Sequence, residues 1–127
     1  MTPEQLVREA LEAMHFAYVP YSGFTVGAAL LTKSGKVYRG CNIENAAYGP
    51  SNCAERTAIF KAVSEGEREF AAIAVVGGKD GVVTDIFPPC GVCRQVMREF
   101  APELEVICLN GKGEAKHYTL RQLLPES

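Results

Sequence analysis

The chain has 127 residues and a formal net charge of −2, with 47% hydrophobic and 22% charged residues. This length is typical of one domain with one core, so we expect residues 1–127 to fold as a single domain. The slight acidic balance disfavours a nucleic-acid partner, because such proteins carry basic surfaces for the phosphates. No apolar run reaches the roughly 18 residues of a membrane span, and the N-terminus is amphipathic rather than signal-like. We therefore expect a cytoplasmic protein without membrane partners.

The first half of the chain predicts one helix and a hairpin. Thr2 and Pro3 are typical of an N-cap and a first helical position, and the helix should end before Pro20. Residues 24–32 are β-branched and apolar, and the Lys-Ser-Gly-Lys turn that follows leads into a second strand at 37–43.

A loop at 44–52 and a second helix follow. Ser51 or Asn52 can cap a helix from about 53 to 65, with Gly66 ending it. The apolar run 71–76 suits a central buried strand.

Alternating elements complete the chain. Glycines at 77–81 should break the preceding strand, and Pro88-Pro89 precede a helix at about 91–100. Strands at 105–109 and 115–118 flank an Asn-Gly turn, and a short helix at 120–124 ends the pattern. The order predicts an α/β fold in which helices cover one mixed sheet.

Two cysteine motifs carry the chemistry. Five cysteines in a chain without a secretory signal favour metal binding or catalysis over disulfides. Cys53 is followed two residues later by Glu55, and Cys90 and Cys93 are spaced to share the first turn of a helix. Helix N-termini favour thiolates. Three protein ligands and an adjacent carboxylate are typical of a catalytic zinc site with an open position for water.

Three thiolates around zinc leave a net charge of −1, which would weaken activation of the water. Arg56 is the first candidate to offset this charge, and Arg94 is a weaker one.

Other interpretations remain open. Cys90 and Cys93 also resemble a redox pair, and a non-enzymatic zinc module is possible. A closed structural zinc would need a fourth ligand, for which the other Cys or His candidates are Cys41, Cys108, His15 and His117.

These motifs resemble those of the zinc-dependent deaminase superfamily, whose signature is His or Cys, any residue, Glu, and later Pro-Cys-x-x-Cys. Within it, the chain is similar to the cytidine deaminase family over nearly its whole length. The segments that resemble it are Tyr18-Val-Pro-Tyr-Ser22, Phe24-Thr-Val-Gly-Ala-Ala29, Gly40-Cys-Asn-Ile-Glu-Asn-Ala46, Asn52-Cys-Ala-Glu-Arg56, Pro89-Cys-Gly-Val-Cys-Arg-Gln95 and Leu123-Leu124-Pro125.

The resemblance implies a three-layer α/β/α sandwich around a five-stranded mixed sheet, one zinc ion per subunit and a homotetramer. It assigns the zinc to the three cysteines and proton transfer to Glu55. Asn42 and Glu44 would bind the ribose, Phe24 would lie along the pyrimidine, and the backbone N–H of Ala54 would contact its carbonyl.

The resemblance also implies that Ala46 and Tyr48 reach a neighbouring subunit's site. Family members of this size often place a Phe three residues after Leu-Leu-Pro, whereas this sequence reads Glu126-Ser127. Either another aromatic such as Tyr48 covers the base, or that stacking is absent.

The resulting hypothesis is zinc-dependent hydrolysis of cytidine and deoxycytidine to uridine and deoxyuridine, with release of ammonia, in pyrimidine salvage. The alternative by resemblance is a deaminase of another aminopyrimidine nucleoside such as blasticidin S. Asn42 and Glu44 favour a simple nucleoside, and the net charge of −2 gives no support for deamination within RNA or DNA.

Overall fold

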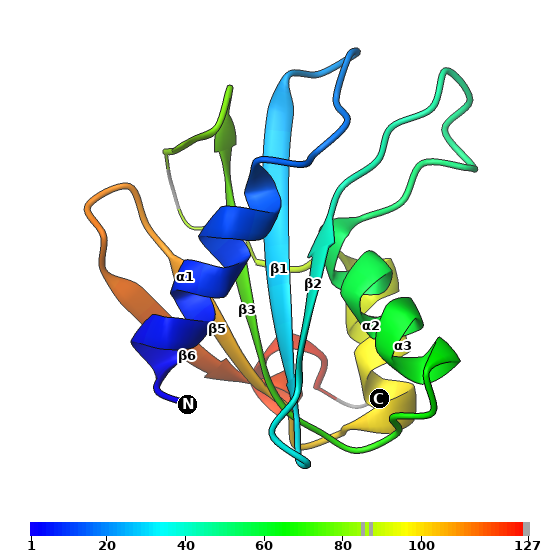
Figure 1. The fold of residues 1–127 in the computed structure, drawn as a ribbon, viewed down its shortest axis with the longest axis vertical. Helices are drawn as coiled ribbons and strands as arrows, with labels where there is room; N and C mark the ends of the chain where they lie inside the picture. The colour runs from blue at the N-terminus through cyan, green and yellow to red at the C-terminus, as the bar shows by residue number, and fades with distance from the viewer. Residues whose placement is uncertain (85, 87, 126–127) are drawn as a thin grey trace.

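A mixed six-stranded sheet forms the centre of the molecule, in a computed structural model that describes residues 1–84, 86 and 88–125 (Figure 1). Five strands lie in the order β2-β1-β3-β5-β6, and the short β4 pairs with β3 outside this path. Only the β3–β5 pair is parallel among these pairings. The strands are β1 (Phe24–Thr32), β2 (Val37–Cys41), β3 (Phe70–Lys79), β4 (Val82–Val83), β5 (Glu105–Leu109) and β6 (Ala115–Thr119).

Helices cover both faces of this sheet. On one face lies α1 (Pro3–Met14), and on the other lie α2 (Ala54–Ser64) and α3 (Gly91–Phe100), with the short α4 (Leu120–Leu123) nearby (Figure 1). This arrangement confirms the predicted three-layer sandwich. The expected five strands are present, and β4 is an additional two-residue strand.

The two cores follow from the alternation of side chains along the central strand β1. Ala28 and Leu30 pack in the cluster formed with α2 and α3, whereas Ala29 and Leu31 pack in the cluster formed with α1. A strand buried on both faces reads as a continuous apolar run.

Two glycines let helices approach the sheet closely. A Cβ built on Gly40 of β2 would lie 2.3 Å from the Ala54 carbonyl oxygen at the start of α2. A Cβ on Gly27 of β1 would lie 2.1 Å from the carbonyl oxygen of Ala10 in α1. These contacts set the depth at which each helix lies on its face of the sheet.

Most helix and strand boundaries agree with those predicted from the sequence. Thr2 caps α1 through a complete capping box with Gln5, and α3 begins and ends where predicted. The predicted cap of α2 was wrong, because Cys53 occupies the N-cap and neither Ser51 nor Asn52 does.

The predicted break of the third strand was also misplaced. β3 continues to Lys79, because Gly77 and Gly78 pair with Val26 and Thr25 of β1. Strand β2 ends at Cys41, short of the predicted 43, and Ile43 makes only isolated bridges.

Within the described part of the chain, no helix has the length and apolarity needed to cross a membrane. Glu126 and Ser127, which follow the Leu-Leu-Pro segment, lie outside the described residues.

Candidate metal and catalytic site

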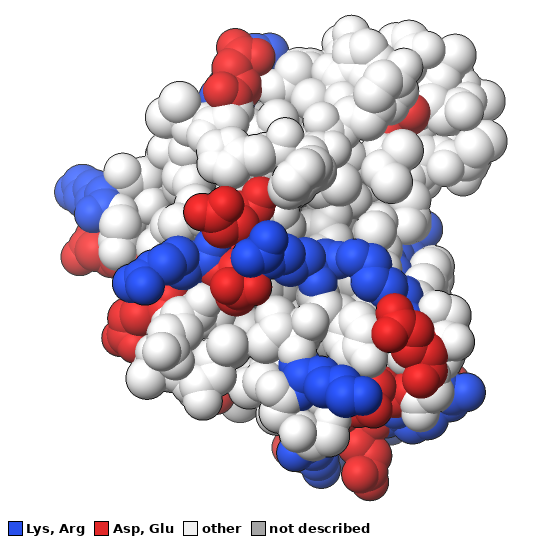
Figure 2. Space-filling model, viewed as in Figure 1, with Lys and Arg blue, Asp and Glu red and all other residues white. Residues whose placement is uncertain are grey.

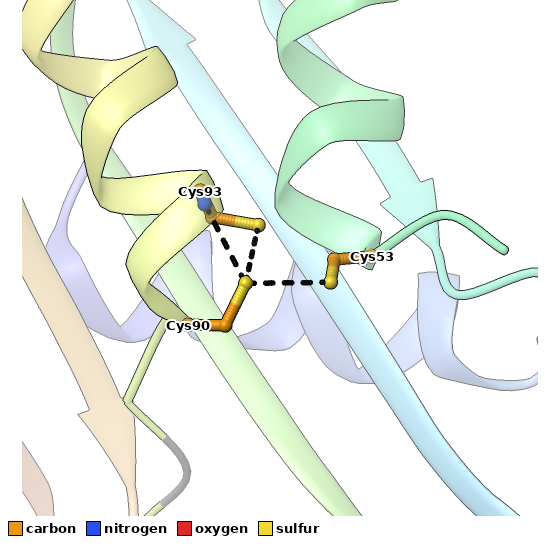
Figure 3. Close-up of side chains that lie close together, drawn as sticks. All are labelled: Cys53, Cys90 and Cys93. Atoms are coloured by element: carbon orange, nitrogen blue, oxygen red, sulfur yellow. Dashed lines mark hydrogen bonds between the residues drawn. The ribbon is translucent and has the colours of Figure 1, made fainter. Parts of the chain in front are cut away.

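Three thiols converge where α2 and α3 begin (Figure 3). Cys53 is the N-cap of α2 and Cys90 the N-cap of α3. The Sγ atom of Cys90 lies 3.6 Å from that of Cys53 and 3.4 Å from that of Cys93, and the three sulfurs lie within 4.8 Å of one another. The backbone N–H of Cys93 also donates to the Cys90 sulfur at 3.5 Å. The predicted metal ligands thus lie close enough to bind one ion.

The surroundings shift the pKa values of two of these thiols in opposite directions. A hydrogen bond from the Cys93 thiol, assisted by others from Arg56 and Cys90, lowers the pKa of Cys53 to about 5. The same sharing with Cys53, together with burial, raises the pKa of Cys93, which favours its protonated form. Metal binding releases such protons, because the thiolate is the ligand.

Of the two arginines predicted to offset the thiolate charge, Arg56 contacts the three-cysteine cluster. Its Nη2 donates to the Cys53 sulfur at 3.3 Å, and its Nε is buried without a partner among the described residues. Arg94 instead donates to the backbone carbonyls of Pro89 and Leu123, at 2.7 Å each. Arg94 therefore supports the chain around the Cys90 motif, while Arg56 lies where it can offset thiolate charge.

Glu55 is buried next to the thiols, with 1% of its surface exposed. Burial raises its pKa to about 7, because the charged carboxylate loses solvation. Its Oε1 has no hydrogen-bond partner within the described structure. An unpartnered buried oxygen costs stability, so this position is suited to chemistry rather than to packing.

A cavity of about 450 Å³ opens beside Glu55 and two of the cysteines. This size is within the range of small-molecule sites, roughly 300–1,000 Å³. Of the predicted substrate contacts, Ala46 lies outside its lining. Those that line it are Phe24, Asn42, Glu44, Tyr48 and Ala54.

Asn42 and Glu44 are both held firmly. The Asn42 amide bridges β1, accepting from the backbone N–H of Val26 and donating to the carbonyl of Phe24, at 2.9 Å each. The Glu44 carboxylate accepts the backbone N–H groups of Tyr21 and Ser22. These bonds fix both side chains at the wall of the cavity.

Sequence reasoning did not single out Ser22, whose hydroxyl donates to Glu44 Oε2 at 2.6 Å. This hydrogen bond lowers the pKa of Glu44. The only sequence signal was the position of Ser22 within the Tyr18–Ser22 segment that resembles the family.

Tyr48 is 95% exposed at the cavity mouth. Ala54 is the first residue of α2, so its N–H has no intrahelical acceptor. Both placements are compatible with the contacts expected of them.

The donor set fits a catalytic rather than a closed zinc site. The cluster of possible ligands found among the described residues contains three cysteines and no fourth member. Cys108 is buried in the core, and His117 pairs with Glu105 at 2.8 Å. Thiolate ligands suit soft or borderline metals such as zinc, and the Glu55 carboxylate, whose Oε1 has no partner among the described residues, lies beside them.

The chain is similar to known deaminases. Residues 1–109 match the model of the cytidine and deoxycytidylate deaminase zinc-binding region. The chain is 54% identical to a cytidine deaminase of Halalkalibacterium halodurans, over 98% of this chain and 92% of that protein. A Blasticidin-S deaminase of Bacillus cereus is 31% identical, over 95% and 88%.

A solved structure gives the same result at the level of the fold. The crystal structure of a cytidine deaminase from Burkholderia pseudomallei superposes with a TM-score of 0.92 at 51% identity, covering 100% of this chain and 99% of that one. The matched residues 1–109 include the three-cysteine cluster and the adjacent Glu55. The chain therefore belongs to the cytidine and deoxycytidylate deaminase family.

Proposed function

We propose that this chain hydrolyses cytidine and 2′-deoxycytidine to uridine and 2′-deoxyuridine, releasing ammonia, with residues 1–127 acting as one catalytic domain. The observation that carries the proposal is the unpartnered, buried Oε1 of Glu55 beside three sulfurs at the wall of a nucleoside-sized cavity.

Cys53, Cys90 and Cys93 hold the zinc ion in this proposal. Zinc supplies Lewis-acid activation of a water molecule, lowering the pKa of that water towards about 7. Arg56 offsets the excess negative charge of the thiolates from its position at the Cys53 sulfur.

Glu55 moves the protons. Its Oε1 accepts a proton from the water and delivers it to N3 of the pyrimidine, which makes C4 electrophilic. The water oxygen adds to C4 as a hydroxyl group. Glu55, unprotonated again, takes the remaining proton of that hydroxyl and passes it to the amino group, so that the C4–N bond breaks, ammonia leaves and the C4 carbonyl forms. The raised pKa of Glu55, about 7, suits a group that must both take and give a proton near neutral pH.

Other residues that line the cavity orient the nucleoside in this proposal. Asn42 and Glu44 bind the ribose, Phe24 lies along the pyrimidine, and the Ala54 N–H donates to the pyrimidine carbonyl. The support is their common place in the cavity lining. The lower identity to a Blasticidin-S deaminase, 31% against 54% for a cytidine deaminase, favours the simple nucleoside as substrate. A cytoplasmic role in pyrimidine salvage is part of the same proposal.

The active form in this proposal is a homotetramer, in which Ala46 and Tyr48 reach a neighbouring subunit. Exposed apolar side chains support it: Phe16, Tyr18, Tyr21, Ile43 and Tyr48. Of these, Ile43 and Tyr48 line the cavity. The upper part of the face seen in Figure 2 carries few charged residues. Light scattering on purified protein should give four times the 13.8 kDa chain mass, and a monomeric active enzyme would contradict this part.

Glu55→Gln tests the chemistry, because it keeps the size of the side chain but cannot accept the proton. We expect kcat for cytidine to fall at least 10²-fold, as general acid–base catalysis is lost, while zinc content stays equal to that of the unchanged protein. Ammonia release should be measured on cytidine, 2′-deoxycytidine, cytosine and blasticidin S. Near-normal turnover by the zinc-loaded variant contradicts the role of Glu55. Preference of the unchanged protein for blasticidin S contradicts the substrate.

A further inference from the structure

Ser22 connects two walls of the substrate cavity through a single hydroxyl group. Its Oγ donates to Glu44 Oε2 at 2.6 Å and accepts the backbone N–H of Phe24 at 3.0 Å. Ser22, Phe24 and Glu44 all line the cavity. The serine therefore lies between the residue proposed to bind the ribose and the one proposed to lie along the base.

The hydrogen bonds to Glu44 leave one acceptor position of its carboxylate available. A carboxylate offers about four acceptor positions, two on each oxygen. Oε1 accepts the N–H groups of Tyr21 and Ser22, both at 3.1 Å, and Oε2 accepts the Ser22 hydroxyl. Counting these described partners, one position on Oε2 remains for a ligand, and only a hydrogen-bond donor can use it.

We propose that Ser22 is a positioning residue that turns Glu44 so that this one position on Oε2 receives a ring hydroxyl of the nucleoside sugar. The inference rests on the proposed function, in which Glu44 binds the ribose. Without the Ser22 hydroxyl, Oε2 can rotate towards water, and the cavity loses its preference for a sugar that carries ring hydroxyls.

Ser22 is itself held in place from a distant part of the chain. Its carbonyl oxygen accepts Lys79 Nζ at 2.9 Å, and the neighbouring Gly23 carbonyl accepts the backbone N–H of Asp80 at 3.0 Å. The turn between β3 and β4 thus supports the segment that orients Glu44. A serine whose backbone is held in this way can keep a carboxylate in one orientation.

The test compares Ser22→Ala with the unchanged enzyme on two substrates, cytidine and 2′,3′-dideoxycytidine. With cytidine we expect kcat/KM to fall roughly tenfold, which is at the low end of the cost of losing a hydrogen bond to a charged group. The loss should lie mainly in KM. With the dideoxy substrate, which has no ring hydroxyl, the two enzymes should differ less than twofold. Ser22→Thr, which keeps the hydroxyl, should restore most of the activity on cytidine.

Ser34→Ala is the matched control. Ser34 donates to Glu67 at 2.8 Å in the exposed turn after β1, so this variant loses a similar serine–glutamate bond at the opposite end of the strand. It should leave both substrates unaffected. Melting temperature and zinc content should be measured for all variants, since a general loosening of the segment would slow both substrates equally.

The outcomes separate the inference from the function on which it rests. If the unchanged protein does not deaminate cytidine, both fall. If it does, and Ser22→Ala either matches it on cytidine or is impaired equally on both substrates, the positioning role of Ser22 is wrong while the proposed function stands.

Discussion

Substituting Arg56 tests whether a nearby positive charge offsets the excess negative charge of three thiolates around one metal ion. The change is Arg56→Gln, which keeps a polar side chain of moderate length but removes the positive charge 3.3 Å from the Cys53 sulfur. We expect the fold to persist and the affinity for zinc to fall.

The size of the effect follows from that distance. Two unit charges at 3.3 Å interact by about 5 kcal/mol at an effective dielectric constant near 20. Both Cys53 and Arg56 are half-buried, so solvent screening reduces this to roughly 2–3 kcal/mol. That energy corresponds to about 30–150-fold in an equilibrium constant. Loss of groups that support metal ligands typically costs 10–100-fold, so a decrease of this order in zinc affinity is expected.

The assay is competition for zinc between the protein and a chromophoric chelator, followed by kcat/KM for cytidine at saturating zinc. Arg68→Gln is the control, because Arg68 donates to the Val63 carbonyl near the other end of α2 and should leave zinc affinity unchanged. If Arg56→Gln changes both zinc affinity and kcat/KM by less than twofold, the charge-offset argument is refuted.

The remaining predictions concern the two glycines beneath the helices. Gly40→Ala places a Cβ 2.3 Å from the Ala54 carbonyl oxygen; we expect a loss of about 1–3 kcal/mol in urea unfolding, together with weaker zinc binding, because α2 must move. Gly27→Ala clashes with α1 at 2.1 Å on the opposite face and should cost similar stability, but the folded variant should keep its zinc affinity. Equal zinc affinity in both variants would contradict the view that Gly40 sets the position of the ligands.

Local signals made much of this fold predictable. The helix at Gly91–Phe100 follows two prolines and ends before another, and the strand at Phe24–Thr32 is a long apolar run. The course of β3 was not predictable in the same way. Gly77 and Gly78 disfavour a strand locally, and pairing with β1 overrides that preference.

The candidate site likewise has one part that the sequence predicts and one part that only the structure shows. Cys53, Glu55, Cys90 and Cys93 could be proposed from the sequence, because metal chemistry requires particular residue types at particular spacings. The contact between Ser22 and Glu44 joins residues 22 positions apart through a common side chain. The spacing of a serine and a glutamate in the sequence does not predict such a contact, so it can be identified only from the structure.

The parallel pairing of β3 and β5 has a consequence for when the metal can bind during folding. Cys53 starts the helix that precedes β3, while Cys90 and Cys93 start the helix that precedes β5. A growing chain that has been synthesised only as far as β3 contains one of the three proposed ligands, Cys53. The ligands meet only after a long loop has closed, at an entropic cost that zinc cannot offset beforehand. The three cysteines can therefore bind one zinc ion together only after the chain from α2 to α3 has been synthesised and folded back.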